Sequence, residues 1–448
     1  MNPSNSRPGV STQIIIAGVI VILVVAAAAG YFLLTPGSGS ASSSTSSSAA
    51  MTVNIASSPL CKSTQTITIG ELNDLSGGLS TEGIPIKASM AIAVSDINKN
   101  VTAAGCTVKF AVDVYDYALD NQKALTQMQT WSSQGVGAVV GPLNSGTAQF
   151  LLTYAQSNHI VLISPSSTSP ALVIPNRHYL YRTAPNDAAQ GLAAGRILVD
   201  RGYSAVIIVN RHDTYGDGLA NATAARFTAL GGKVVDTIPY DTATTDFTAI
   251  LTKLNTDYQS AVSTYGASKV AIYDVAFQEA GTMLIQAGTS FPGLLTPTWF
   301  GSDGEATLSQ FVNGTAVTTA TAKVKLVSTL YAPQNNTASL AFLKVFSAAS
   351  SESCSFYCLG AYDDTWIAAL SILQAGKTDG ASIDAALPGV AAEVNGVTGN
   401  NALQASGDRI PGSYQIWKVV ADSTGKGSWV NAGTWDYTAD KVTWTSAP

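Results

Sequence analysis

The stretch VGAVVGPLNSGTAQFLLTYAQSNHIVLISPSSTSP, residues 136–170, holds two short apolar runs that decide the fold class. These runs are VGAVVG at 136–141 and IVLIS at 160–164, and a polar loop follows each of them. Short runs rich in Val and Ile are typical of strands buried in a parallel sheet. The stretch therefore predicts two strands with a polar loop after each.

The same pattern recurs on both sides of this stretch. Helical segments with apolar residues at three- and four-residue spacing, such as 87–99 and 122–134, separate the apolar runs. The series pauses at YRTAP, residues 181–185, and then starts again. This repetition predicts an α/β protein with two doubly wound, Rossmann-like lobes. The other predicted strands are 67–72, 108–115, 205–210, 233–238 and 269–275.

The loops that follow the predicted strands are small, polar and rich in hydroxyl groups. Ligands of open α/β sheets bind beyond the carboxyl ends of the strands, so a site is expected in these loops. Loops 141–147 and 164–170 present hydroxyls and backbone N–H groups at helix starts, a setting that favours a carboxylate. In the second half, Tyr215 and Asp303 follow strands. A carboxylate facing an anion site suits a zwitterion.

Length and charge narrow the classes of protein. The 448 residues are enough for two to three domain-sized units at roughly 150 residues each. The net charge is −6, which leaves no basic excess to neutralise phosphates, so no nucleic-acid partner is expected. Only 12% of the residues are charged, and the abundance of Ser, Thr, Ala and Gly suits an external medium.

The first sixty residues predict a leader (1–13), a membrane anchor (14–34) and a Ser- and Gly-rich linker (35–60). The anchor run is uncharged and, as a helix, long enough to span a hydrocarbon layer of about 30 Å. It is longer than the core of a cleaved secretory signal, and Arg7 is the only charge before it, which favours a retained transmembrane helix. We expect a single N-terminal anchor in the cell membrane and an extracellular body.

The four cysteines favour disulfides. Cys61 lies just before the first predicted strand and Cys106 just before the second, so neighbouring strands would bring them within bridging distance. Cys354 and Cys358 are close enough in sequence to pair locally. The even count, the lack of a CxxC motif and the three histidines favour disulfides in an oxidising exterior over free buried thiols or a metal site.

Six motifs are spread over about residues 66–440: SGGLSTEG (76–83), VVGP to Ser145 (139–145), ISPSSTSP (163–170), YRTAPNDAAQG (181–191), YGDGLA (215–220) and GDR (407–409). In order and spacing they resemble the motifs of the extracellular solute-binding proteins of the leucine/isoleucine/valine-binding type, the type I periplasmic binding proteins. The resemblance implies that two lobes close over a small solute, an amino acid, and deliver it to an ABC transporter permease.

The resemblance also implies the domain organisation. Lobe 1 is expected to comprise 66–183 plus 331–408, and lobe 2 to comprise 184–330 plus 409–448. The segment RPGVSTQ, residues 7–13, before the hydrophobic run resembles the archaeal, membrane-anchored form of these proteins. The three crossings of the hinge are expected near Thr183, Leu330 and Asp408.

Residue roles follow from the resemblance one position at a time. Ser145, Ser166 through its backbone, and Thr168 match the groups that bind the ligand carboxylate. Tyr215 matches the tyrosine of the second lobe that closes over the ligand. Asp303 stands where the family places the acidic partner of the α-ammonium group.

The residues expected around the ligand side chain depart from those of branched-chain amino acid binders. Glu82 occupies a position that is often aromatic or apolar, and Ala276 replaces a tyrosine beside Phe277; Leu79 completes this expected lining. A carboxylate next to an isobutyl group would waste desolvation energy unless it meets a polar ligand group. A polar or basic amino acid, an amide or a short peptide therefore stays open beside a branched-chain amino acid.

Other functional classes fit the sequence less well. It has no GxSxG elbow, Walker A loop or GxGxxG after a strand, and His159, His178 and His212 have no signature tying them to a nucleophile. We therefore expect no catalytic residue, cofactor or metal. A sensor or receptor ectodomain is the stronger alternative, because fold alone does not decide function, although little sequence precedes the predicted span to carry a signal. A surface adhesion or assembly protein is a third possibility.

Overall fold

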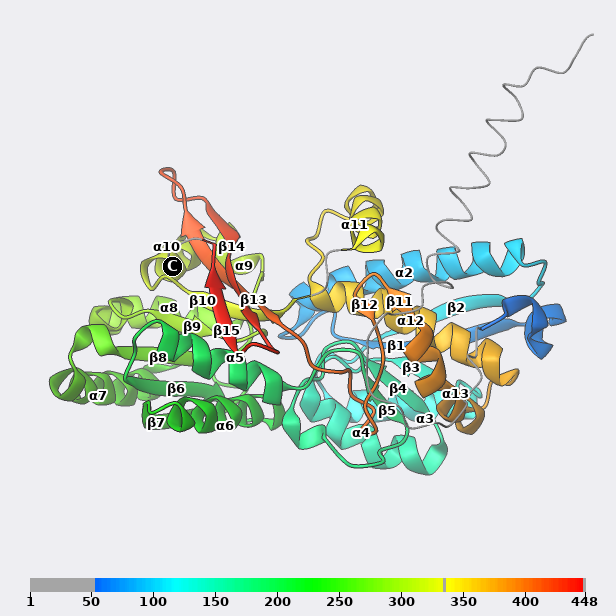
Figure 1. Cartoon of the computed structure of the whole chain (residues 1–448), viewed down its shortest axis with the longest axis horizontal. Coiled ribbons are helices and arrows are strands. Elements are labelled where there is room, and N and C mark those ends of the chain that lie inside the picture. Colours follow the sequence, from blue (N-terminus) through cyan, green and yellow to red (C-terminus); the bar gives the residue numbers. More distant parts are fainter. Residues whose placement is uncertain (1–52, 333–335, 446–448) are drawn as a thin grey trace, which may run out of the picture.

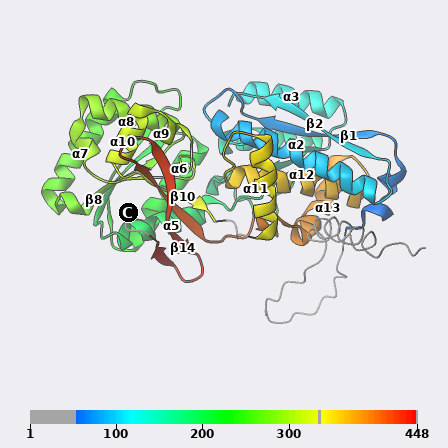
Figure 2. The ribbon, with the colours of Figure 1, turned by 90° about the horizontal axis from the view of Figure 1, so that it is seen from above.

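Two β-sheets covered by helices organise the computed structural model, which describes residues 53–332 and 336–445 (Figure 1). Each sheet is the centre of one lobe, and the lobes lie side by side along the longest axis of the molecule (Figure 2). The predicted leader, the predicted transmembrane helix at 14–34 and most of the predicted linker lie outside the described residues. Within the described ranges, no helix combines the length and apolar character needed to cross a membrane.

Five parallel strands form the sheet of lobe 1, in the spatial order β2 (Lys109–Asp116), β1 (Thr66–Asn73), β3 (Ala138–Val140), β4 (Val161–Ser164) and β5 (Leu180–Arg182). Helices α3 (Asn121–Ser133) and α4 (Ser145–Asn158) cover one face, where Leu72, Val139 and Leu162 are buried. The next strand positions, such as Ile69 and Val140, point to the opposite face because side chains alternate along a strand. That face is covered by α2 (Ser80–Ala103), α12 (Phe356–Ala375) and α13 (Gly380–Glu393), with α11 (Thr337–Ala349) packed against α2.

The sheet of lobe 2 joins a parallel part to an antiparallel part. The parallel strands run in the order β7 (Lys233–Tyr240), β6 (Ala205–Arg211), β8 (Val270–Val275), β9 (Trp299–Gly301) and β10 (Val327–Tyr331). Beside β10, the antiparallel strands β13 (Tyr414–Ala421), β14 (Gly427–Asp436) and β15 (Lys441–Trp444) extend the sheet.

Helices cover both faces of the parallel part of this sheet. Residues of α5 (Asp187–Asp200) and α6 (Thr214–Ala229) pack against Val206 and Ile208, and residues of α7 (Thr248–Tyr265) and α8 (Glu279–Ser290) pack against Ile207 and Val209. The shorter elements are α9 (Gln310–Asn313), α10 (Thr315–Lys323), the β11 (Asn395–Gly396) and β12 (Gly399–Asn400) pair, and 3-10 turns at Ile55–Ser57, Pro59–Lys62, Pro170–Leu172, Ala267–Lys269 and Pro292–Leu295.

The strands predicted from the sequence agree with this architecture. Each of the seven predicted runs coincides with a strand, and the bounds differ by at most two residues. The predicted helical segment 87–99 lies within α2, and the segment 122–134 coincides with α3 except for its last residue. The α/β class with parallel-sheet lobes is confirmed, and the antiparallel strands β13 to β15 are an addition that the sequence reading did not predict.

The chain passes between the two sheets after β5, after β10 and before β13. The first and third connections run side by side, since Arg182 N–H donates to the Gly407 carbonyl at 2.9 Å and Arg409 N–H donates to the Arg182 carbonyl at 2.8 Å. Leu330, where a crossing was expected, lies inside β10, and the connection to α11 follows that strand.

A buried ion-pair cluster joins the first and third connections. Asp408 Oδ1 accepts hydrogen bonds from Arg177 Nη2 at 2.7 Å and from Arg182 Nε at 2.6 Å, and the three side chains are fully buried. Burial alone would raise the pKa of Asp408, but the hydrogen bonds and charges of the two arginines outweigh it and hold this pKa below its ordinary value. The cluster anchors the hinge end of lobe 1.

Both predicted disulfides are present in the structure. Cys61–Cys106 ties the 3-10 turn before β1 to the chain entering β2. Cys354–Cys358 closes a short loop onto the first turn of α12. Each pair joins the two cysteines that the sequence reading placed together.

Candidate functional site

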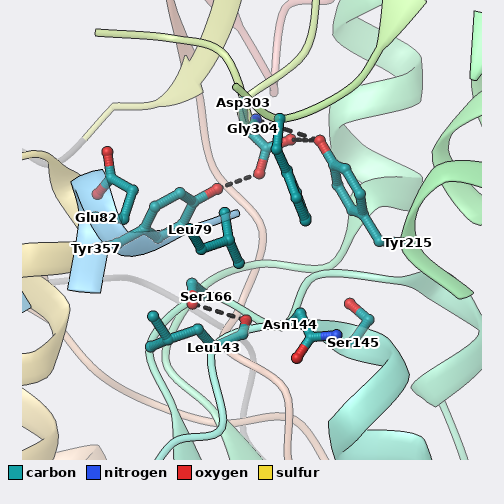
Figure 3. A pocket seen from close by; sticks show the side chains of 11 residues that line it. Leu79, Glu82, Leu143, Asn144, Ser145, Ser166, Tyr215, Asp303, Gly304 and Tyr357 are labelled. Atoms are coloured by element: carbon teal, nitrogen blue, oxygen red, sulfur yellow. Dashed lines mark hydrogen bonds between the residues drawn. The ribbon is translucent and has the colours of Figure 1, made fainter. Parts of the chain in front are cut away.

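A pocket lies between the two lobes, beside the loops that follow strands of both sheets (Figure 3). Its volume is about 30 Å³, which is room for about two water molecules. Lobe 1 contributes Leu79, Glu82, Leu143, Asn144, Ser145, Ser166 and Tyr357, and lobe 2 contributes Tyr215, Phe277, Asp303 and Gly304.

One side of the pocket is rich in hydroxyl and backbone N–H groups. It is formed where β3 ends and α4 begins, and by the loop after β4. The Asn144 side chain does not cap α4; its Oδ1 accepts from the Tyr117 hydroxyl at 2.7 Å instead. Ser145 Oγ accepts from the Ser169 N–H at 3.1 Å, and Ser166 Oγ donates to the Leu143 carbonyl at 2.8 Å. A helix start without a side-chain cap, flanked by hydroxyls, is suited to bind a carboxylate.

Asp303 forms the opposite side of the pocket with two tyrosines (Figure 3). Tyr215, in the first turn of α6, donates to Asp303 Oδ1 at 2.6 Å, and Tyr357, in the first turn of α12, donates to Asp303 Oδ2. Phe277 stacks on Tyr215 with ring centroids 5.2 Å apart. Because Tyr357 belongs to lobe 1 and Asp303 to lobe 2, their hydrogen bond joins the lobes across the pocket.

Glu82 adds a second carboxylate to the lining. It lies in the first turn of α2, and its Oε2 accepts from the Ser355 hydroxyl at 2.6 Å. Burial raises the pKa of Glu82 to about 7; the Ser355 hydrogen bond opposes this rise and the charge of Asp303 adds to it. Burial likewise raises the pKa of Asp303, against the hydrogen bonds from the two tyrosines. Among the described residues that line the pocket, none is Lys, Arg or His.

Asp187 lies close behind this acidic side, at the start of α5. Its side chain is fully buried, and a hydrogen bond from the Thr168 side chain and the charge of Arg182 offset that burial only in part. Burial and then the charge of Asp303 raise its pKa well above the ordinary value. The pocket therefore lies in a region of concentrated acidic groups.

The structure brings most of the sequence-predicted site residues together. Thr168 and Ala276 do not line the pocket. Ala276 directly follows β8 and is buried in the lobe 2 core, while the next side chain, Phe277, points the other way and reaches the pocket. The Thr168 carbonyl accepts from the Asp187 N–H at 2.7 Å, which turns this residue toward α5. The predicted residues that line the pocket are Leu79, Glu82, Ser145, Ser166, Tyr215, Phe277 and Asp303.

Sequence reasoning missed four lining residues: Leu143, Asn144, Gly304 and Tyr357. The first three lie in strand-end loops that the sequence did mark, next to residues that were chosen. Tyr357 lies on α12, after the chain has returned to lobe 1. It does not follow a parallel strand, so the expectation that site residues lie in the loops after such strands does not include it. The flanking pair Cys354 and Cys358 was the available signal, since a disulfide there fixes the start of that helix.

Two lobes built on parallel strands, three chain connections and a pocket between the lobes with hydroxyl and carboxyl groups in its lining are the architecture of a two-lobed binding protein. Residues 66–426 match the family model described as periplasmic binding protein, and the chain belongs to this family. The family expected from the motifs is thereby confirmed.

Relatives of this chain include both curated proteins and solved structures. An uncharacterised protein of Methanocaldococcus jannaschii is 31% identical over 395 residues, covering 84% of this chain and 91% of the relative. The leucine-, isoleucine-, valine-, threonine- and alanine-binding protein of Pseudomonas aeruginosa is 24% identical over 368 residues, covering 81% and 92%. The crystal structure of the branched-chain amino acid transporter substrate binding protein LivJ from Streptococcus pneumoniae, in complex with isoleucine, has a TM-score of 0.63 at 24% identity and covers 82% of this chain and all of that one. The two relatives with printed functions are binding proteins rather than enzymes.

Proposed function

We propose that this protein is the solute-binding component of an ABC importer and captures an α-amino acid between its lobes for delivery to a permease. The observation that carries the proposal is that hydroxyl groups and a carboxylate lie on opposite sides of the pocket. Ser145, Ser166 and the start of α4 form one side, and Asp303 with its tyrosines forms the other. A zwitterion placed between them offers its carboxylate to the hydroxyl side and its ammonium group to Asp303.

Binding proceeds through hinge closure in this proposal. The pocket of about 30 Å³ is too small for an amino acid, so the solute enters when the lobes are apart, and the lobes then close on it at a separation somewhat wider than the structure shows. The carboxylate binds first to the lobe 1 loops, and closure then brings Tyr215 and Asp303 onto the ammonium group. Delivery follows when the permease selects the closed form, which differs in shape from the open one.

The same proposal places the body outside the cell. The uncharged run at 14–34 serves as the membrane anchor and the Ser- and Gly-rich linker as a tether that lets the lobes reach the permease. The two disulfides support this placement, because such bonds persist in an oxidising compartment.

A thermal-shift screen of the full-length protein in nanodiscs, stripped of bound solute by partial unfolding and refolding, tests the proposal. The panel comprises the twenty amino acids, small amides, sugars and short peptides. A solute at 100 times its dissociation constant adds about 2.7 kcal/mol to the free energy of unfolding, a clear rise in the melting temperature. Stabilisation by sugars alone contradicts the proposal. A panel without any binder removes the basis for transport and favours a surface adhesion or assembly role.

A further inference from the structure

We propose that the solute carries a second cationic group besides its α-ammonium group, so that the ligand class is the basic amino acids. This inference rests on the proposed function and narrows it. Its basis is the placement of two carboxylates, Glu82 from lobe 1 and Asp303 from lobe 2, on the lining of one small pocket.

The partners of the two carboxylates among the described residues are uncharged, and the Gln190 side chain adds a hydrogen bond to those that Asp303 receives from hydroxyls. Glu82 accepts from Ser355, and Asp303 accepts from Tyr215 and Tyr357. Elsewhere, the buried Asp408 meets two arginines. An ionised carboxylate taken out of water costs several kcal/mol unless a cation or several donors compensate. Asp274 and Asp364 are also buried carboxylates, but they do not line the pocket, where a solute can supply a cation.

Arg211 and Arg182, which contact or act on residues at the pocket, are already paired with other acids. Arg211 lies over the Phe277 ring, 3.6 Å from its centroid, and its guanidinium donates to Asp213 and Glu279. Arg182, which lowers the pKa of Asp187 by its charge, is ion-paired with Asp408. The side of the pocket that holds Glu82 and Asp303 therefore offers two carboxyl groups and, among the described residues that line it, no cation to pair with them.

The arrangement of the pocket assigns each group of such a solute a partner. Figure 3 shows Glu82 and Asp303 on one side with Tyr357 between them, and Asn144, Ser145 and Ser166 on the other side. If the α-carboxylate of the solute lies on the hydroxyl side and its α-ammonium group at Asp303, the side chain of the solute runs past Leu79 toward Glu82. A terminal amine or guanidinium there meets an acid, whereas an isobutyl group desolvates Glu82 without giving it a counter-charge.

Matched ligands test the charge directly. Full-length protein in nanodiscs, stripped of solute, is titrated calorimetrically with lysine, ornithine and arginine, with norleucine, which keeps the chain of lysine and lacks its amine, and with glutamine. At least one basic amino acid is expected to bind about 100-fold more tightly than norleucine, the size of effect expected for a desolvated charge pair.

The variant Glu82→Gln removes one charge and keeps the shape of the side chain. It is expected to abolish most of the preference for the basic amino acid and to strengthen norleucine binding, because the apolar side chain then no longer desolvates a charge. Measurable norleucine binding also shows that the pocket is folded. Glu393→Gln, at the exposed end of α13, is the matched control and is expected to change neither affinity.

Two results overturn the inference while amino acid binding stands. Norleucine or leucine binding as tightly as every basic amino acid shows that Glu82 pairs with no ligand cation. Glutamine binding more tightly than every basic amino acid shows that Glu82 acts in its protonated form as a hydrogen-bond donor. Failure of all amino acids to bind overturns the proposed function itself, and the inference with it.

Discussion

Asp303 receives a hydrogen bond from Tyr215 of its own lobe and one from Tyr357 of lobe 1, so the second of these bonds forms only once the lobes have met. An ammonium group adds the cation that these hydroxyls do not provide. Asp303→Asn keeps an oxygen acceptor for the tyrosines and removes the charge. We expect it to weaken binding of the identified amino acid by roughly 2 to 4 kcal/mol, measured by calorimetry, because a desolvated ammonium group loses its counter-charge.

The control for this variant is Asp241→Asn, an exposed carboxylate in the turn after β7. It is expected to leave the affinity within error of the parent protein. An effect of Asp303→Asn below about half a kcal/mol would remove Asp303 from the ammonium site, because so small a loss is typical of exposed pairs.

Glu71 offers a pH test that is independent of the ligand. It lies on β1, fully buried; Oε1 accepts from Asn73 Nδ2 at 2.6 Å and Oε2 has no partner within the described residues. Burial raises its pKa from 4.5 to about 7, against the Asn73 hydrogen bond and the charge of Lys87. As the pH rises, the unfolded chain therefore loses this proton before the folded protein does. Between pH 4.5 and about 7, the free energy of unfolding falls progressively below that of a variant with a neutral side chain at this position.

Glu71→Gln is expected to stabilise the protein above pH 7 by roughly 1 to 3 kcal/mol and to have little effect near pH 4.5. Urea unfolding at several pH values measures the difference, with Glu393→Gln as the exposed control. An equal effect at pH 4.5 and pH 8 would mean that the change comes from packing rather than from the proton.

At the scale of elements, the sequence predicted those strands whose burial leaves a clear pattern of apolar residues. Strand β6 begins with a continuous apolar run and β1 alternates Thr with Ile, and both were found within one residue of their bounds. Strands β5 and β9 have three residues each and, unlike β3, do not lie in a longer run rich in Val, so their pairing comes from neighbours already in place. The antiparallel strands β13 to β15 alternate in exposure only partly, and their position beside β10 depends on the third hinge connection. This is why strand-end residues of the site were predictable and Tyr357 was not.

The disulfide Cys354–Cys358 holds the start of α12, which presents two groups to the pocket. Ser355, the residue before α12, accepts from the Tyr357 N–H at 3.1 Å while its hydroxyl donates to Glu82, and Tyr357 reaches Asp303. The double variant Cys354→Ser/Cys358→Ser is expected to weaken ligand binding about threefold to thirtyfold, because both side chains must then be ordered on binding.

The control is Cys61→Ser/Cys106→Ser, which removes a disulfide of lobe 1 between the turn before β1 and the chain entering β2. Calorimetry and melting curves are compared for both variants. The control is expected to lower the melting temperature without loss of affinity. Equal losses of affinity in the two variants would assign the effect to general destabilisation.

Asp408 makes the stability of the hinge depend on buried charges. Asp408→Asn leaves two buried arginines without their shared counter-ion, and we expect it to lower the free energy of unfolding by about 3 to 5 kcal/mol. Since the pKa of Asp408 is lowered in the folded protein, its contribution is present above the unfolded pKa of about 4 and is lost as the pH falls through the folded pKa. Urea unfolding of the variant and of the control Asp241→Asn at pH 7 measures the loss; a change below about 1 kcal/mol would contradict the role of the cluster.

At the scale of the whole molecule, the lobes are in contact around the pocket. Besides the bond between Tyr357 and Asp303, Ser169 Oγ donates to the Thr214 carbonyl at 2.6 Å, and the Thr214 hydroxyl donates to Gln149 at 2.6 Å. These contacts describe a closed arrangement. The sequence could indicate two lobes because strand periodicity is local, but it could not indicate their separation, which depends on a few polar contacts between distant segments.

Closure is therefore expected to be a measurable equilibrium that the solute shifts. Fluorescent labels introduced as unnatural amino acids at the exposed positions Lys123 on α3 and Ile285 on α8 report the distance between lobes in the full-length protein. Without solute, the distribution should include a population with longer distances, and saturating solute should remove it, because only the closed form completes the site. Tyr357→Phe, which lacks the hydroxyl that reaches Asp303, should enlarge the open population before solute is added. Identical distributions with and without a solute that calorimetry shows to be bound would contradict hinge closure, and binding would then have to occur in a pocket already formed.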